Sequence, residues 1–494
     1  MAVLGIELCD AGFQAATSEG GKVTGPLLEG GAGPLGWMGL AYHDGQKTWF
    51  GPPAEEAWYV RPKQIGHDFW NRLSRESSAL GPPGKPLSFS QLAYFSLRDY
   101  YERVTAVSGP PEKLLLAVPG EYLKDGATED ERIGLLLGMA TELKLPLVGI
   151  ADMACAALCD PRLGHFDRTL PVLVVDLHLH GAELTLFRHD TQFVRHGYAC
   201  LPHVGHAELL RQVVSLMGNR FLRHTTFDIQ EDGRVEQIFY RQTKDFLLNG
   251  QAEQHYQIST GNRTYEMNAT REQLGADTAT FGQALVAAAV ALLAKGATGR
   301  PERCTVALTA RAGLLPGLAA RFRNAGLTRL LQMPAGAAAV GAAAIGEHRA
   351  VLEDLSELPV DTAVPDALVP QRQSGHCEVR LIKSRRAATA LRPSHAICEG
   401  SGHILDNHTD FTIGTEAEAP DLALPEDFNA SGTSCFIRME LADGHWWLLG
   451  GERSEEAERT PLESGDRLAV RLGACETEVL FAYCPELPAL RRRE

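Results

Sequence analysis

Residues 172–188 read VLVVDLHLHGAELTLFR and constrain the fold more strongly than any other stretch of the chain. The apolar run LPVLVVDL (170–177) and the run GAELTLFR (181–188) are typical of two buried strands joined as a hairpin. The turn between them holds His178 and His180, directly after Asp176. Three interpretations are open for this turn: a metal site, a phosphate-binding turn, or a phosphate-binding turn that has lost its function.

The residues on either side of this hairpin alternate between strand-like and helix-like patterns. VLGIEL (3–8), KLLLAVPG (113–120), PLVGI (146–150) and CTVALTA (304–310) predict buried strands. Apolar residues at helical spacing predict helices over 128–144, 152–159, 208–217 and 281–295, the first with Thr128 and Glu131 as a capping box. Strands interleaved with helices indicate an α/β sheet covered by helices.

The pattern changes after residue 349. A chain of 494 residues is expected to hold more than one domain. Residues 350–375 carry several prolines and acids without periodicity and predict a linker. After it, short β-like runs separated by turn residues predict an all-β sandwich over 376–486 and a tail at 487–494. These runs are EVRLIK, SHAIC, HILDN, FTIG, SCFIRMEL, HWWLLG, DRLAVRL and TEVLFAYC.

Composition and charge exclude several classes of protein. A net charge of −15 argues against a general nucleic-acid binder, which would need a basic face. The start MAVLGIELCD lacks the basic lead of a signal peptide, and the longest apolar runs are too short to cross a bilayer. The 10 cysteines include no C-x-x-C pair, as expected for free thiols in a reducing compartment. We therefore expect a cytoplasmic protein that binds neither membranes nor nucleic acids.

The order of motifs over residues 1–348 resembles the nucleotide-binding domain of DnaK-type heat-shock chaperones, in the actin-like ATPase superfamily. Gly5-Ile6-Glu7-Leu8-Cys9-Asp10-Ala11 stands where that family has its first phosphate loop, G-I-D-L-G-T-T. VVDLHLHGAELTLF stands where D-L-G-G-G-T-F-D-V-S-I is expected. Further weak matches follow in the right order: FGPPA, FWNRL, LLLAVPGEYLKDG…ADMACAAL, VEQIFYRQTKDFLLN, MNATREQL, VALTARAGLLPGLAARF and MPAGAAAVGAAAIG. The resemblance implies a two-lobed α/β domain with ribonuclease-H-like subdomains over 1–349.

The same resemblance implies which residues would bind ATP and magnesium. The candidates for nucleotide binding are Asp10, Asp176, Gly181, Glu183, Lys244 and Arg311. If the cleft is active, Asp176, Asp152 and Glu7 are the catalytic candidates of a weak ATPase. In such sites glycine turns let backbone N–H groups wrap the phosphates, and carboxylates hold the magnesium through water.

This chain departs from the family at most of the positions that carry the chemistry. Asp10 places an acid beside the expected polyanion, and Asn71 stands where the family has the lysine that positions water. Side chains replace glycines at His178, Leu179 and His180 in the second phosphate loop and at Ala310 and Arg311 near the adenine. Little is left to stabilise phosphoryl transfer. We therefore expect a pseudo-ATPase with no resident cofactor; ATP with magnesium is the alternative.

The C-terminal region resembles a forkhead-associated domain. Gly414, Asp421, Leu424, Leu462, Gly465 and Asp466 match the scaffold positions of that family. The residues that would read phosphothreonine are replaced by Thr415 and by Ser431-Gly432-Thr433-Ser434. Because phosphate recognition depends on arginine and charge-assisted hydrogen bonds, we expect no strong phosphothreonine binding.

Three functional hypotheses follow. The first is a DnaK-like protein without the usual substrate-binding domain that acts as a nucleotide-independent scaffold or co-chaperone for protein partners or clients. The second is an active ATP-binding switch with atypical loops. The third is metal or small-molecule binding in the altered cleft through Asp176, His178 and His180, since two histidines one residue apart on an extended strand share one face.

Overall fold

The computed structural model describes residues 2–27, 33–82, 84–123, 130–163, 170–189, 192–295, 304–351, 358–364, 377–384, 391–398, 401–405, 410–414, 420–425, 436–449, 460–472 and 475–483. The chain divides into two compact units. The first comprises Met1–Leu163 and Asp167–Val369, and the second comprises Gly164–Phe166 and Pro370–Glu494. The mixed α/β architecture and the strand-rich C-terminal region predicted from the sequence are both present.

One six-stranded sheet of the first unit is built around the N-terminal strand. Its order is β16-β8-β7-β1-β2-β3. The central strand β1 pairs antiparallel with β2 and parallel with β7, and β7 pairs parallel with β8. Every residue of β1 is buried, as expected for a strand that helices cover. The bounds are β1 (Val3–Glu7), β2 (Gln14–Glu19), β3 (Lys22–Thr24), β7 (Lys113–Val118), β8 (Leu147–Asp152) and β16 (Val360–Asp361).

A second six-stranded sheet repeats this arrangement with the hairpin that the sequence predicts. Its order is β15-β14-β9-β10-β11-β17, and β9 pairs antiparallel with β10 and parallel with β14. Strand β9 therefore holds the place in this sheet that β1 holds in the other. The bounds are β9 (Val172–Leu177), β10 (Gly181–His189), β11 (Phe193–Pro202), β14 (Thr305–Leu308), β15 (Arg329–Gln332) and β17 (Ala363–Val364).

Helix α11 (Ala337–Glu347) packs on the first sheet at a distance that only glycine permits. A Cβ on Gly5 of β1 would lie 2.1 Å from the carbonyl oxygen of Ala339. A Cβ on Gly341 would lie 1.7 Å from the carbonyl oxygen of Ala156 in α4 (Met153–Leu158). Residues 337–346 of α11 are buried or nearly so, since α11 contacts β1, β2, β7 and α4 together.

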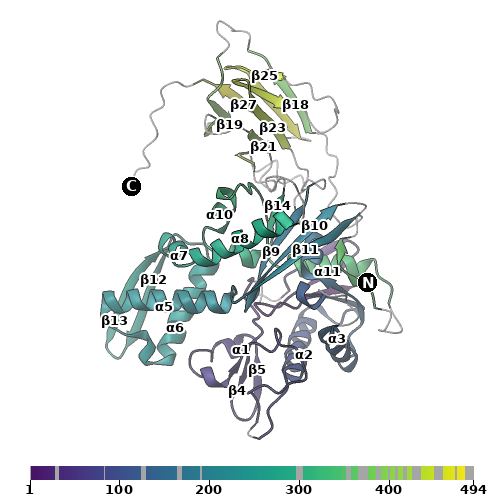
Figure 1. The fold of residues 1–494 in the computed structure, drawn as a ribbon, viewed down its shortest axis with the longest axis vertical. Coiled ribbons are helices and arrows are strands. Elements are labelled where there is room, and N and C mark those ends of the chain that lie inside the picture. Colours follow the sequence, from purple (N-terminus) through teal and green to yellow (C-terminus); the bar gives the residue numbers. More distant parts are fainter. Residues whose placement is uncertain are drawn as a thin grey trace. The chain divides into compact units, whose positions relative to one another are not determined.

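The remaining elements of the first unit are labelled in Figure 1, where one group of two helices and a hairpin lies together at the left. Helices α5 (His206–Thr225) and α6 (Gly233–Leu248) pack together against the hairpin of β12 (Glu253–Thr260) and β13 (Arg263–Thr270). The others are α1 (Pro52–Glu55), α2 (Phe89–Ser108), α3 (Glu131–Glu142), α7 (Arg271–Asp277), α8 (Ala279–Lys295), α9 (Ala310–Gly313), α10 (Leu318–Asn324), β4 (Ala41–His43), β5 (Thr48–Phe50) and β6 (Ile65–Gly66). Short 3₁₀ turns lie at Pro62–Gln64, Gly120–Leu123 and Ile229–Glu231.

Part of the range 350–375, predicted as a linker, is described by the structure; residues 352–357 and 365–375 lie outside the described residues. Residues 360–364 form two short strands: β16 extends the first sheet beside β8, and β17 extends the second sheet beside β11. The segment VDTAV is rich in β-branched residues, which favour strands. The prolines on either side of it led to the prediction of a linker instead. The chain therefore crosses from one sheet to the other at this point.

The second unit contains two five-stranded sheets around its own core. Their orders are β18-β26-β27-β19-β20 and β22-β21-β23-β24-β25. All the β-like runs quoted above contribute a strand, and Trp446 is fully buried in the core with Phe411 and Phe481. The bounds are β18 (Cys377–Ile382), β19 (His395–Cys398), β20 (Ser401–Ile404), β21 (Asp410–Gly414), β22 (Leu422–Ala423), β23 (Phe436–Ala442), β24 (His445–Leu449), β25 (Thr460–Leu462), β26 (Arg467–Leu472) and β27 (Cys475–Ala482).

Two residues that match forkhead-associated scaffold positions, Asp466 and Asp421, accept several hydrogen bonds each within the second unit. Asp466 is fully buried and accepts hydrogen bonds from Lys383 and from the backbone N–H of Ser384 and Glu463. Asp421 accepts from the backbone and hydroxyl of Thr412. Thr415 and Ser431–Ser434, on which the phosphothreonine expectation depends, lie outside the described residues, so that expectation stays a prediction.

Within the described ranges, no single helix is long and apolar enough to cross a membrane. Helices α7 and α8 reach the required length and composition only as a pair, and they are bent by 58° where they join.

The close packing of α11 gives the first prediction. Gly341→Ala should lower the free energy of unfolding by at least about 2 kcal/mol, because the new Cβ meets backbone atoms of α4 rather than a side chain that can turn away. The matched control is Gly134→Ala in α3, where nothing lies within 4 Å of the new Cβ. It should raise stability by about 0.5–1 kcal/mol through helix propensity. Urea denaturation measures both, and equal effects at the two positions would contradict the packing.

Candidate functional site

Two hairpin turns, one from each six-stranded sheet, meet inside the first unit. The turn after β1 carries Cys9 and Asp10, and the turn after β9 carries His178, Leu179 and His180. The carboxylate Oδ1 of Asp10 accepts a hydrogen bond of 2.8 Å from the backbone N–H of Leu179. An internal carboxylate thus occupies the amide that a phosphate-binding turn would offer to a phosphate.

Further backbone groups of the turn at residues 178–180 are hydrogen-bonded within the protein. The N–H of His178 donates to the carbonyl of Gly181 at 2.8 Å, which closes the turn. At the start of α5, the N–H groups of His206 and Ala207 donate to the carbonyls of His178 and Leu179. The N-terminus of a helix is a common anion site, and here its first amides are used by the turn.

Arg311 joins the two sheets through a buried ion pair with two carboxylates. Its guanidinium contacts Glu7 at the end of β1, and it contacts Asp176 of β9 twice, with Nε at 3.1 Å from Oδ1 and Nη2 at 2.6 Å from Oδ2. All three residues are at most 6% exposed. Thr309, the N-cap of α9, donates its hydroxyl to Asp176 at 2.6 Å and accepts from the N–H of Ala312, which fixes the short helix that carries Arg311.

The charges of this group shift one another's pKa. Burial by itself raises the pKa of the Asp176 carboxyl, but Arg311, His178 and the Thr309 hydroxyl outweigh it and hold the pKa below its usual value. Burial raises the pKa of Glu7, and the positive charge of Arg311 only partly offsets this rise. Burial opposes the charge of Arg311 as well, yet the neighbouring Asp176 and Glu7 raise its pKa. Asp176 and Arg311 are therefore both ionised at neutral pH.

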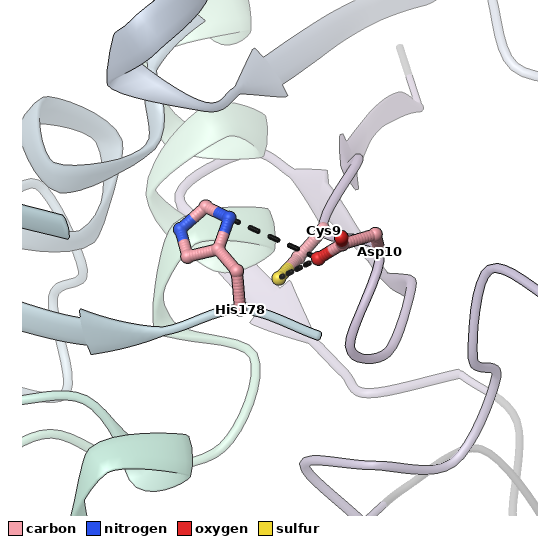
Figure 2. Close-up of side chains that lie close together, drawn as sticks. All are labelled: Cys9, Asp10 and His178. Atoms are coloured by element: carbon pink, nitrogen blue, oxygen red, sulfur yellow. Dashed lines mark hydrogen bonds and ion pairs between the residues drawn. The ribbon is translucent and has the colours of Figure 1, made fainter. Parts of the chain in front are cut away.

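His178 lies among carboxylates on both sides of its ring. Its Nδ1 is 3.9 Å from Asp10 Oδ1, and its Nε2 is 3.7 Å from both Asp176 Oδ2 and Glu183 Oε2 (Figure 2 shows the Asp10 side). Burial lowers the pKa of His178, but Glu183, Asp176 and Asp10 together raise it above its ordinary value. Its side chain is 10% exposed, and Nε2 has no hydrogen-bond partner.

A second arginine neutralises Asp152. Arg195 Nη1 lies 3.0 Å from Asp152 Oδ2, while Asp152 Oδ1 caps α4 by accepting from the N–H of Ala154. The pKa of Asp152 is raised to about 6 overall. Burial is the largest cause, Arg195 partly offsets it, and the negative charge of Glu183 adds to the rise. Glu183 accepts from the backbone N–H of Gly120 and Glu121 and from the hydroxyl of Tyr198.

The other predicted residues lie in separate contacts. Lys244 donates to both carboxylate oxygens of Glu55, at 2.7 and 2.9 Å, and to the carbonyl of Leu35, which uses its three donors. Gly181 is the first residue of β10, where a Cβ would lie 3.0 Å from the carbonyl oxygen of Leu201. Its role is close packing of the hairpin.

His178 and His180 do not lie together on one strand face, because residues 178–180 form a turn rather than an extended strand. Nε2 of His180 lies 2.8 Å from the carbonyl of His67, and Nδ1 lies 3.6 Å from Glu208. The group of converging metal-ligand atoms among the described residues is Cys9, Asp10 and His178, without His180 or Asp176.

The residues at this place do not fit a nucleotide. Glu7, Asp176, Glu183, Thr309 and Arg311 are among the residues that line a pocket at this place, and their charged groups bind one another rather than leaving free ligands for phosphate or magnesium. The three catalytic candidates are each paired with an arginine: Glu7 and Asp176 with Arg311, and Asp152 with Arg195. Asp10, the acid beside the expected polyanion, takes the amide of Leu179 instead.

Sequence reasoning missed the partners that complete these contacts. Glu55, Arg195, Tyr198 and Thr309 were not selected, and only Thr309 carries a local signal, as a threonine at the end of a strand and the start of a helix. A comparison of the chain with models of known protein families finds no match, and a comparison with curated proteins finds none either.

Arg311→Met tests the ion pair that joins the sheets. It should lower the free energy of unfolding by about 3–5 kcal/mol, because two buried carboxylates lose their cation while the apolar stem is kept. The triple variant Arg311→Met, Glu7→Gln, Asp176→Asn removes the uncompensated charge and should recover part of the loss. Guanidinium denaturation measures both. A loss below about 1 kcal/mol, or no recovery in the triple variant, would show that the pair does not hold the sheets together.

The raised pKa of Asp152 predicts a pH dependence of stability. With a pKa of about 6 in the folded chain and 3.8 as its ordinary value, the folded state binds the proton more tightly, so protonation stabilises the fold. As the pH falls from 7 to 4, the wild type should gain up to about 3 kcal/mol relative to Asp152→Asn. Urea denaturation of both proteins across this range measures the difference, and a difference that does not change with pH would refute the shift.

Proposed function

We propose that this chain is a DnaK-like chaperone-family protein without the usual substrate-binding domain, acting as a nucleotide-independent scaffold or co-chaperone that binds protein partners. The observation that carries the proposal is the self-satisfied site between the two hairpin turns. Asp10 takes the amide where a phosphate would bind, and Arg311 places a fixed cation between Glu7 and Asp176, where a magnesium ion would be needed.

The matching topology of the two six-stranded sheets supports the resemblance on which the proposal rests. An actin-like domain has two ribonuclease-H-like subdomains, each with a central strand, antiparallel neighbours on one side and parallel ones on the other. The sheets around β1 and β9 have this order and these directions. We therefore propose a two-lobed actin-like fold for the first unit.

A scaffold of this kind would use rigid surfaces rather than a cycle of opening and closing. Arg311 ties the ends of β1 and β9, and the crossing strands β16 and β17 join the edges of the two sheets. In a nucleotide-driven switch, a ligand must bind one state better than another. In a first unit that its own side chains already hold closed, ATP would have no open and closed states to bind with different affinity. The forkhead-associated-like sandwich would then serve as a second docking surface.

Calorimetric titration with ATP and magnesium tests the proposal. We expect no binding tighter than about 1 mM, which corresponds to about −4 kcal/mol, and no ATP hydrolysis above background. Weak heat, if seen, should be the same in Lys244→Ala, because that lysine is held by Glu55 rather than by nucleotide. A micromolar constant that Lys244→Ala weakens would overturn the proposal in favour of an active ATP-binding switch.

A further inference from the structure

Three side chains with different metal-binding atoms converge where the two hairpin turns meet. Cys9 Sγ, Asp10 Oδ1 and His178 Nδ1 all lie within 4.8 Å of one another, and all three residues are buried (Figure 2). The Sγ–Oδ1 distance is 4.0 Å and the Nδ1–Oδ1 distance is 3.9 Å. Cys9 and Asp10 follow β1, and His178 follows β9, so the group spans both sheets.

The buried charges around this group are unbalanced. The described carboxylates here are Glu7, Asp10, Asp152, Asp176 and Glu183, and each is at most 8% exposed. The described arginines that pair with them are Arg311 and Arg195. With all five carboxylates ionised, the two arginines and a protonated His178 leave the group two charges negative. Because uncompensated buried charge is costly, a divalent cation would stabilise this cluster.

The second ring nitrogen of His178 also fits a metal on Nδ1. Its side chain is nine-tenths buried, and its Nε2 has no hydrogen-bond partner while facing Asp176 and Glu183 at 3.7 Å. A histidine that binds a metal through one ring nitrogen usually directs the other N–H to a carboxylate, which fixes its tautomer. With a metal on Nδ1, the N–H on Nε2 would point at these two carboxylates.

The donor set selects the class of metal. A thiolate, an imidazole and a carboxylate suit zinc, whereas magnesium and calcium prefer oxygen alone. Tetrahedral zinc with its usual bond lengths brings such ligand atoms to about 3.3–3.6 Å from one another. The Sγ–Oδ1 and Nδ1–Oδ1 distances exceed that by about half an ångström, and all three atoms lie within 4.8 Å of one another, so the side chains must rotate inward to bind the metal.

We propose that Cys9, Asp10 and His178 form a zinc-class metal site that fastens the turn after β1 to the turn after β9, with Asp176 and Glu183 orienting His178. On binding, the Cys9 thiol loses its proton to solvent and the sulfur becomes the metal ligand. The site goes beyond the scaffold function and does not depend on whether ATP binds. It would make zinc a structural part of the closed first unit.

Metal analysis of the purified full-length protein tests the site. Protein produced with zinc in the medium should carry one equivalent of zinc, and zinc added to chelator-treated protein should raise the melting temperature. Cobalt in place of zinc should give tetrahedral d–d absorption and a thiolate-to-cobalt charge-transfer band. Cys9→Ser should lose the band, and both Cys9→Ser and His178→Ala should lose the metal.

Matched controls separate the site from general effects of cysteine or histidine loss. Cys304→Ser removes a buried free thiol directly before β14, and His180→Ala removes the neighbouring histidine; both should keep the zinc. Glu183→Gln should keep the stoichiometry and weaken zinc binding about 10–100-fold. No zinc above trace in the wild type, or zinc retained in both Cys9→Ser and His178→Ala, would overturn the proposal. Micromolar ATP binding would overturn the scaffold function and leave the zinc result unchanged.

Discussion

The buried pairing of Arg311 with Glu7 and Asp176 is the interaction on which the rest of the site depends. Each carboxylate stands at the end of the central strand of one sheet, so a single guanidinium fixes the distance between the two strands. The burial of the two carboxylates is possible because the guanidinium offsets part of their charge. Arg311 thus lies between the two carboxylates, at a place where the actin-like resemblance would put a metal ion and phosphate.

The packing around the pair leaves it little freedom to move. Gly5 and Gly341 let α11 approach β1 and α4 so closely that backbone touches backbone. The turn of residues 178–180 is held by Asp10 on one side and by the first amides of α5 on the other. These contacts are mutually consistent with one closed arrangement of the first unit.

Local patterns in the sequence were sufficient to predict most of the elements. The hairpin at 172–188, the strands at 3–8, 113–120 and 304–310, and the strand-rich C-terminal region are confirmed, because each depends on a run of apolar or β-branched residues. The helix predicted over 128–144 begins at Glu131 with Asp130 as its cap, so its start was placed too early. The strands within 360–364 were missed because pairing with the edges of two sheets is a long-range effect.

The site was predictable by position but not by its contacts. The resemblance selected Glu7, Asp10, Asp176 and Arg311, and the structure brings these four together. The resemblance assigned Arg311 to nucleotide binding, whereas its side chain pairs with carboxylates on two strands that are distant in sequence. No local sequence pattern reveals this pairing.

The most direct measurement is a crystal structure of the protein grown with millimolar ATP and magnesium. We expect Arg311 between Glu7 and Asp176 and no nucleotide density; a bound nucleotide with Arg311 displaced would show that the cleft is a working nucleotide site.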